Sequence, residues 1–183
     1  MNTIIEEIPS VKILGTRVDM IRMTDVIVEM ARWIEEEPHR VHHFVNTGMH
    51  GIMEAHKDPE FGAILNSADL LAPDGILAIL VARLHGYRLR KQDIGPDLLW
   101  QFSEIAHRKG FKYFFFGDTE ETLQRLCNKL SSEFPGLRIA GYASPPFRAW
   151  TLEEDEAMVA AINQAKPDVL WVGLGMPKQE QWI

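Results

Sequence analysis

Short β-type runs alternate with helical runs along most of this chain, and that alternation constrains its fold more than any other feature. In the second half, strands are predicted at 111–116, 137–140 and 169–172, with helices at 118–134 and 153–165 between them. Strand, helix and strand in succession imply right-handed crossovers between parallel strands. We therefore predict an α/β fold with a mainly parallel sheet covered by helices on both faces.

The first half follows the same rule with shorter elements. Strands are predicted at 11–14, 17–19, 42–46 and 69–72. Helices are predicted at 24–34, 49–56, 59–66 and 75–84, and from Pro96 to a stop at Gly110. The helix at 75–84 is almost wholly apolar, so we expect it to be buried on most sides. No repeat or linker interrupts the pattern, which predicts a single domain over residues 1–183.

Composition excludes several classes of protein. The chain has 26 Asp and Glu against 19 Lys and Arg, a formal net charge of −7, which argues against a nucleic-acid partner. Its one cysteine, Cys127, excludes an internal disulfide and a multi-thiolate zinc site, and its apolar neighbours predict a core position on a helix. No signal peptide opens the chain, and its longest apolar run is too short to cross a bilayer. A cytoplasmic protein is therefore expected.

Ligands of parallel α/β folds bind beyond the carboxyl ends of strands, so the residues after each predicted strand are the candidates for a site. The segments that meet this condition are 46–48, 73–75, 117–119 and 173–180. They contain a carboxylate that follows a strand directly, Asp74, and glycines that let a ligand approach the backbone, Gly173 and Gly175.

Four stretches of this sequence carry a family resemblance. They are Ala68-Asp69-Leu70-Leu71-Ala72-Pro73-Asp74-Gly75, Gly95-Pro96-Asp97, Phe115-Phe116-Gly117 and Val172-Gly173-Leu174-Gly175-Met176-Pro177-Lys178-Gln179-Glu180. With them, the chain resembles the bacterial WecG/TagA/CpsF family of glycosyltransferases from about Val11 to Ile183. The resemblance implies a Rossmann-like fold and inverting transfer of a sugar, such as N-acetylmannosamine or a uronic acid, from a UDP-sugar donor. The acceptor it implies is a polyprenyl-diphosphate-linked sugar, in the synthesis of cell-surface polysaccharides.

Inverting transfer requires a base that removes the proton of the acceptor hydroxyl. Asp74 fits this role, because it stands between Pro73 and the first turn of a predicted helix, and it matches the aspartate that the family uses as its base. The alternative is that Asp74 caps that helix by accepting the amides of Ile76 and Leu77.

The charge of the departing diphosphate also has to be offset. The sequence has no Asp-x-Asp pair, the usual carboxylate clamp for a divalent metal, so we expect neither a metal nor a cofactor. The candidate phosphate-binding cations are Arg83, Arg88, Arg90, Lys91 and Lys178, of which Arg90, Lys91 and Lys178 are expected to bind substrate, together with helix N-termini. Family members commonly have an arginine where this chain has Gln92, and the alternative for Arg90 and Lys91 is an ordinary solvated loop.

The remaining substrate contacts are expected from polar or small residues after the strands. Asn46, Thr47 and His50 follow one strand, although His50 can equally be a helix histidine without a ligand. Gly75, Gly173 and Gly175 allow close approach to the backbone, and Gln179 is favoured to contact the nucleotide or the sugar. Glu180 is expected to hold its loop by accepting backbone amides. For 117–119, a turn and a helix cap are the preferred interpretation.

Two other functions remain open from the residues alone. One is a nucleotide-sugar-binding family member without activity, and the other is a nucleotide-sugar hydrolase that uses Asp74. Family members usually continue into a C-terminal segment linked to membrane docking and to completing the site, and we expect this chain to lack it. The resemblance also implies peripheral contact with the inner face of the cell membrane, through residues beyond this chain, and allows a homo-oligomer.

Overall fold

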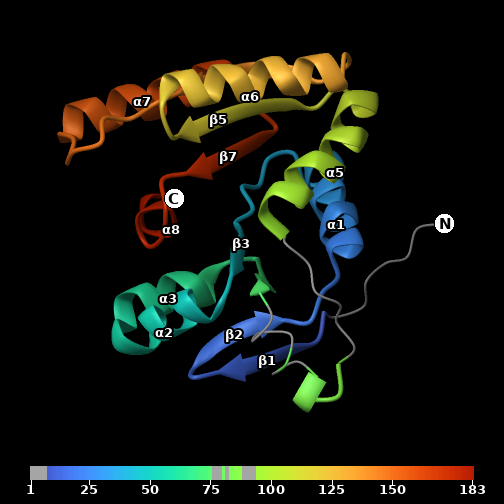
Figure 1. Ribbon diagram of the computed structural model, residues 1–183, viewed down its shortest axis with the longest axis vertical. Coiled ribbons are helices and arrows are strands. Elements are labelled where there is room, and N and C mark those ends of the chain that lie inside the picture. The colour runs from blue at the N-terminus through green and yellow to red at the C-terminus, as the bar shows by residue number, and fades with distance from the viewer. Residues whose placement is uncertain (1–7, 76–79, 81–82, 88–93) are drawn as a thin grey trace. The chain divides into compact units, whose positions relative to one another are not determined.

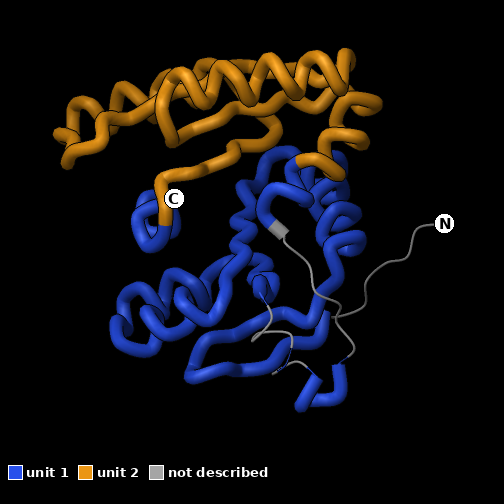
Figure 2. The backbone as a smooth tube through the Cα atoms, viewed as in Figure 1, with its two compact units in different colours: residues 1–99, 176–183 blue, residues 100–175 orange. Residues whose placement is uncertain are grey.

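A computed structural model describes residues 8–75, 80, 83–87 and 94–183 of this chain. The chain forms two compact units, shown in Figure 2. Unit 1 consists of residues 1–99 and 176–183, and unit 2 of residues 100–175. Helix α5 (Ile94–Lys109) begins in unit 1 and ends in unit 2.

Unit 1 contains two small β-ladders (Figure 1). Strands β1 (Ser10–Ile13) and β2 (Thr16–Asp19) form an antiparallel hairpin, whose turn places Leu14 and Gly15 in the left-handed region. Strands β3 (Phe44–Thr47) and β4 (Leu70–Pro73) are parallel, with Phe44 opposite Leu70 and Thr47 opposite Pro73. The carboxyl ends of β3 and β4 therefore lie next to each other.

Helices surround these ladders. They are α1 (Met23–Glu36), α2 (Met49–Lys57), α3 (Pro59–Ser67) and the short C-terminal α8 (Lys178–Trp182). The core between the hairpin, β3, β4, α2 and α3 contains Val18, Ile52, Phe61, Leu65 and Leu71, each at most 1% exposed. Helix α8 contacts α3, so the end of the chain packs back onto unit 1.

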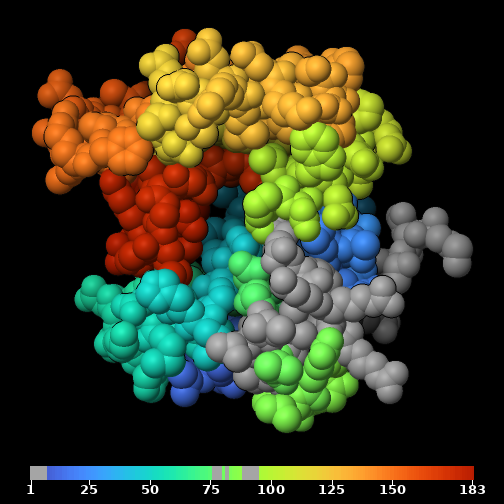
Figure 3. Space-filling view, in the orientation of Figure 1, coloured from blue at the N-terminus to red at the C-terminus, as the bar shows by residue number. Residues whose placement is uncertain are grey.

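Unit 2 contains a three-stranded parallel sheet in the order β6-β5-β7. Its strands are β5 (Lys112–Gly117), β6 (Arg138–Ala143) and β7 (Val169–Gly173), joined through α6 (Glu120–Glu133) and α7 (Leu152–Ala165). The central strand β5 is an apolar run buried on both faces, as expected for a parallel sheet. Leu123, Cys127 and Leu130 form the buried face of α6, whose atoms make a continuous layer in Figure 3 (yellow to orange).

These findings confirm the predicted α/β class with parallel strands and flanking helices, and the core position of Cys127. The parallel strands form two separate sheets in the described residues. The predicted helices at 49–56, 59–66 and 153–165 agree with the structure to within one residue at each end. The single domain predicted over residues 1–183 stays a prediction.

The differences lie at the ends of elements. Helix α1 begins at Met23, one residue before the predicted start, and its N-cap residue Arg22 makes no capping hydrogen bond with its side chain. Pro73 belongs to β4, where it pairs with Thr47 at the strand end and loses no ladder bond that its missing N–H would have made.

The predicted buried helix at 75–84 lies largely outside the described residues. Its described members Leu80 and Leu84 are 45% and 85% exposed, so burial was a wrong expectation at these two positions. No helix in the part of the chain that the structure describes is both long enough and apolar enough to span a bilayer.

Candidate active site

Asp74 follows β4 directly, at the edge where the carboxyl ends of β3 and β4 meet. Its backbone N–H donates to the carbonyl of Thr47 at 2.8 Å, and its Oδ1 accepts from the N–H of Gly75 at 2.8 Å. Gly75 itself has a φ of +73°, which a residue with a side chain rarely adopts. The structure thus brings Thr47, Asp74 and Gly75 together; their roles in a site stay a prediction. Ile76 and Leu77, whose amides a capping Asp74 would accept, lie outside the described residues.

Asn46 and Thr47 are neighbours in β3, but strand alternation turns them to opposite faces. Thr47 is 3% exposed and faces α2, where a side chain at Gly51 would clash with its hydroxyl and with Met176 Sδ. Asn46 faces the start of α5, with its Nδ2 3.8 Å from the position of a Cβ on Gly95. The two predicted ligands therefore do not point into the same space. His50, the second residue of α2, is exposed.

Helix α8 carries the other predicted side chains of unit 1. Lys178 is exposed at its first position, and Gln179 is half-buried. The Gln179 Nε2 donates to Glu180 Oε1 at 2.9 Å, so Glu180 accepts this side-chain amide where backbone amides were expected. Glu180 is only 4% exposed and its Oε2 is buried without a hydrogen-bond partner among the described residues.

Gly173 and Gly175 belong to unit 2. Gly173 ends β7 and its carbonyl accepts the Asp118 N–H at 3.3 Å; Gly175 has a φ of +78°. No atom lies within 4 Å of the place where a Cβ would stand on either glycine, so both border open space.

Thr119, whose hydroxyl accepts the Thr122 N–H, caps α6, which confirms the turn-and-cap interpretation of 117–119. Arg90, Lys91 and Gln92 lie outside the described residues.

A buried carboxylate anchors β4 from the hairpin. Asp19 is 5% exposed, and its Oδ2 accepts the backbone N–H of Leu71 at 2.8 Å. Arg17 lies 3.2 Å from the same carboxylate, and its Nη2 donates to the Ala68 carbonyl at 2.6 Å. Burial raises the pKa of Asp19, and the Leu71 amide and Arg17 oppose this rise. This pair fixes the strand that ends at Asp74.

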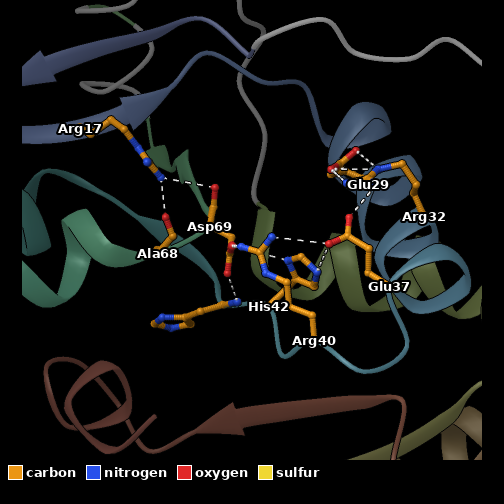
Figure 4. A network of polar contacts seen from close by, with 9 residues as sticks. Arg17, Glu29, Arg32, Glu37, Arg40, His42, Ala68 and Asp69 are labelled. Atoms are coloured by element: carbon orange, nitrogen blue, oxygen red, sulfur yellow. Dashed lines mark hydrogen bonds and ion pairs between the residues drawn. The ribbon is translucent and has the colours of Figure 1, made fainter.

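A second carboxylate, Asp69, joins β3 to β4 at their other end (Figure 4). Its Oδ2 accepts the His43 N–H at 2.9 Å, and its Oδ1 pairs with Arg40. His42 is stacked on Trp33, with ring centroids 4.4 Å apart, and its Nε2 lies 3.2 Å from Glu37. Burial lowers the pKa of His43, and Asp69 and Glu180 oppose this shift.

Sequence reasoning missed the positioning roles of Asp19 and Asp69. The available signal was slight: Asp69 is a charged residue at the start of an otherwise apolar strand, and Asp19 ends the predicted hairpin. Among the described residues, no group of three or more His, Cys, Asp or Glu side chains could hold a metal ion.

Parallel strands, crossover helices and flanking helices place this chain among the α/β proteins, a class in which ligands commonly bind beyond the carboxyl ends of the strands. Residues 11–183 match the Glycosyl transferase WecG/TagA/CpsF family, and the chain belongs to that family.

Curated relatives carry the name N-acetylglucosaminyldiphosphoundecaprenol N-acetyl-beta-D-mannosaminyltransferase. The one from Bacillus subtilis (strain 168) is 32% identical over 128 residues, which cover 69% of this chain and 48% of the relative. The one from Bacillus spizizenii is 32% identical over 130 residues (71% and 49%), and that from Staphylococcus aureus (strain NCTC 8325 / PS 47) is 29% identical over 120 residues (66% and 45%). The chain thus spans about half the length of the curated relatives it matches.

Proposed function

We propose that this chain transfers a sugar from a UDP-sugar to a lipid-diphosphate-linked acceptor, in the synthesis of a cell-surface polysaccharide. Membership of a glycosyltransferase family supports the reaction class. The names of the relatives supply the particular substrates to test, an N-acetylmannosaminyl group and an acceptor of the N-acetylglucosaminyl-diphosphoundecaprenol type. Since the acceptor carries a lipid, the protein would act at the surface of the cytoplasmic membrane. We also propose that residues 1–183 act as one glycosyltransferase domain.

The observation that carries the proposal is the placement of Asp74. One carboxylate oxygen is held by the Gly75 amide, and the backbone is tied to Thr47, so the side chain is fixed at the end of β4. In the reaction, the Asp74 carboxylate takes the proton of the acceptor hydroxyl as its oxygen bonds to the anomeric carbon. The bond from that carbon to the diphosphate breaks on the opposite face, UDP leaves, and the configuration inverts.

Cations and backbone amides would offset the negative charge of the departing diphosphate, without a metal. Lys178 is the exposed cation on α8, and Arg90 and Lys91 are the further candidates. Asn46, Thr47, His50, Gly75, Gly173, Gly175 and Gln179 are proposed to contact the donor or the acceptor. Because Asn46 and Thr47 face opposite sides of β3, we propose that they contact different parts of the substrates.

The test is release of UDP from UDP-N-acetylmannosamine, measured with and without an N-acetylglucosaminyl-diphospholipid acceptor. We expect release that depends on the acceptor. Asp74→Asn is expected to lower turnover by about 10²- to 10⁴-fold, because general-base catalysis contributes on that scale, while UDP affinity changes only a few-fold. Asp25→Asn, on α1 and paired with Arg22, is the matched control.

Three outcomes would contradict the proposal. Release of UDP without acceptor would indicate a hydrolase, and binding of the donor with no release would indicate a non-catalytic nucleotide-sugar-binding protein. An equal loss of UDP affinity and of turnover in Asp74→Asn would assign Asp74 to a structural cap.

A further inference from the structure

Glu180 is a buried acid whose hydrogen bonding is incomplete. Of the two acids that are at most 5% exposed among the described residues, Asp19 has both Leu71 and Arg17 as partners. Glu180 has one partner, Gln179, for Oε1, and Oε2 is buried with none. Burying a carboxylate is costly unless its oxygens are bonded, so a buried glutamate in this position calls for a specific role.

The contact with Gln179 fixes the orientation of an amide. A carboxylate only accepts hydrogen bonds, so the Gln179 amide must turn its nitrogen toward Glu180. The carbonyl oxygen then occupies the other branch of the planar amide and is left for another donor. A free glutamine amide can flip and present either group. With Glu180 beside it, Gln179 presents an acceptor.

His43 can supply the donor that the second oxygen of Glu180 lacks, although no hydrogen bond joins the two side chains in this structure. Its Nε2 is also buried without a partner, and Glu180 acts on its pKa electrostatically, which places the two side chains within range of each other. An imidazole with its proton on Nε2 satisfies both atoms, directly or through a water molecule. The Asp69 carboxylate holds the His43 backbone, so the imidazole is anchored at the start of β3.

We propose that Glu180 is a positioning residue that fixes the side-chain amide of Gln179, so that the Gln179 carbonyl oxygen accepts a hydrogen bond from a hydroxyl or acetamido N–H of the sugar donor. The ligand in this statement rests on the proposed function, whereas the orientation of the amide does not. Through this contact, helix α8 would select a sugar that presents a hydrogen-bond donor to Gln179.

The orientation is tested by NMR on the isotope-labelled chain. We expect the Gln179 side-chain N–H resonances to be shifted and slow to exchange, compared with those of the exposed Gln181. Glu180→Gln should abolish this difference and lower the pKa of His43, because a carboxylate that raises it is removed. Glu121→Gln, at a side chain that is 80% exposed, is the matched control and should change neither.

Unchanged Gln179 resonances and an unchanged His43 titration in Glu180→Gln would overturn the proposal. Should that variant not fold, Gln179→Met tests the same hydrogen bond by removing its donor. Its loss of the hydrogen bond must shift the ¹³C resonance of the Glu180 carboxyl carbon, and an unmoved resonance counts against the contact.

The ligand is tested by calorimetry with UDP-N-acetylmannosamine and with UDP. Glu180→Gln and Gln179→Met should each weaken donor binding by about tenfold, the scale of one hydrogen bond, and leave UDP binding unchanged. The double variant should lose no more than either single one, because the two residues act as a unit. Additive losses, or equal losses for UDP, would show that Glu180 does not act through Gln179. A wild-type chain that does not bind the donor would contradict the proposed function and the ligand, while the amide orientation is still decided by NMR.

Discussion

The two parallel sheets in the described part of the chain have the same hydrogen-bonding pattern, but side chains bind the backbone of their strands at different places. In unit 2, the central strand β5 is a run of buried aromatic side chains, Tyr113, Phe114, Phe115 and Phe116, each at most 4% exposed, and the Asp168 carboxylate holds the amide of its first residue, Lys112. In unit 1, β4 also buries apolar residues, but the buried carboxylate of Asp19 holds the amide of Leu71 inside the strand, and Arg17 holds the carbonyl of Ala68 just before it.

The different side-chain contacts of β4 and β5 fit the different positions that these strands have to fix. Apolar burial is strong but has no direction, so it stabilises a strand without fixing its register or its end to a fraction of an ångström. A carboxylate bonded to one amide fixes both. The ladder that ends at Asp74 uses such directional contacts, which suits a strand that has to hold a reactive carboxylate in one place.

The largest change in stability is expected from a substitution in the buried strand β5. Phe116→Ala, at a side chain that is 1% exposed, should lower the free energy of unfolding by about 3–5 kcal/mol, through lost burial and the cavity left behind. Chemical denaturation gives the size, and hydrogen exchange should show the loss in the amides of β5 and β7. An equal loss of protection in β3 and β4 would mean that the two ladders are not separate in stability.

A smaller effect is expected from the carboxylate of the other ladder. Asp19→Ala removes the acceptor of the Leu71 amide and the carboxylate that pairs with Arg17, which should lower the free energy of unfolding by about 2–3 kcal/mol. The exchange rate of the Leu71 amide reports the change at its source. Asp25→Ala, at a partly exposed acid on α1, serves as control. If Leu71 exchange is unaffected in Asp19→Ala, directional anchoring of β4 is wrong.

The smallest effect is a dependence on pH. Burial lowers the pKa of His43 in the folded chain, so its contribution to stability is present above the unfolded value, about 6.5, and is lost as the pH falls through the folded value. The protection of the β3 and β4 amides should therefore decline from pH 7 to pH 5 more in wild type than in His43→Gln. In unit 2 the groups with shifted pKa values titrate outside this window, Glu154 at about 2 and Cys127 above its usual range, so β5 should show no such decline. If the protection of the β5 amides declines equally over this pH range, or that of the β3 and β4 amides declines equally in His43→Gln, the predicted effect of His43 is wrong.

The sequence pattern predicted the helices and strands of this fold well. The side of each element that is buried carries apolar residues, so the spacing of those residues reveals whether the element is a helix or a strand. The apolar faces of α2, α3 and α7 are visible at helical spacing, and β5 is an uninterrupted apolar run. Element ends were less predictable. Thr119 caps α6 and Asp118 does not, since Asp118 adopts a left-handed conformation and uses its carboxylate on the Thr119 amide.

The site was predicted in part for the same reason. Asp74 follows a strand and can be found from that strand, and the structure places it beside Thr47. Glu180 could not be recognised as buried, because its burial depends on α8 packing against α3, more than a hundred residues earlier in the chain. The opposite directions of Asn46 and Thr47 follow from strand alternation, but the predicted strand ended at Asn46, whereas β3 continues to Thr47.

The close approach of β5 and β7 bears on how this family's sequences should be compared. A Cβ on Gly117 would lie 2.2 Å from the Gly173 carbonyl oxygen, and the residue has a φ of +132°, so no side chain fits there whatever the substrate. Gly173 and Gly175, in contrast, border open space. If relatives also have glycine at position 117, the contact between the two strands explains it. Neither φ nor packing within unit 2 requires a glycine at 173, so a glycine conserved there would indicate selection by a group that occupies the open space. Glycines of the same motif set thus carry different evolutionary information.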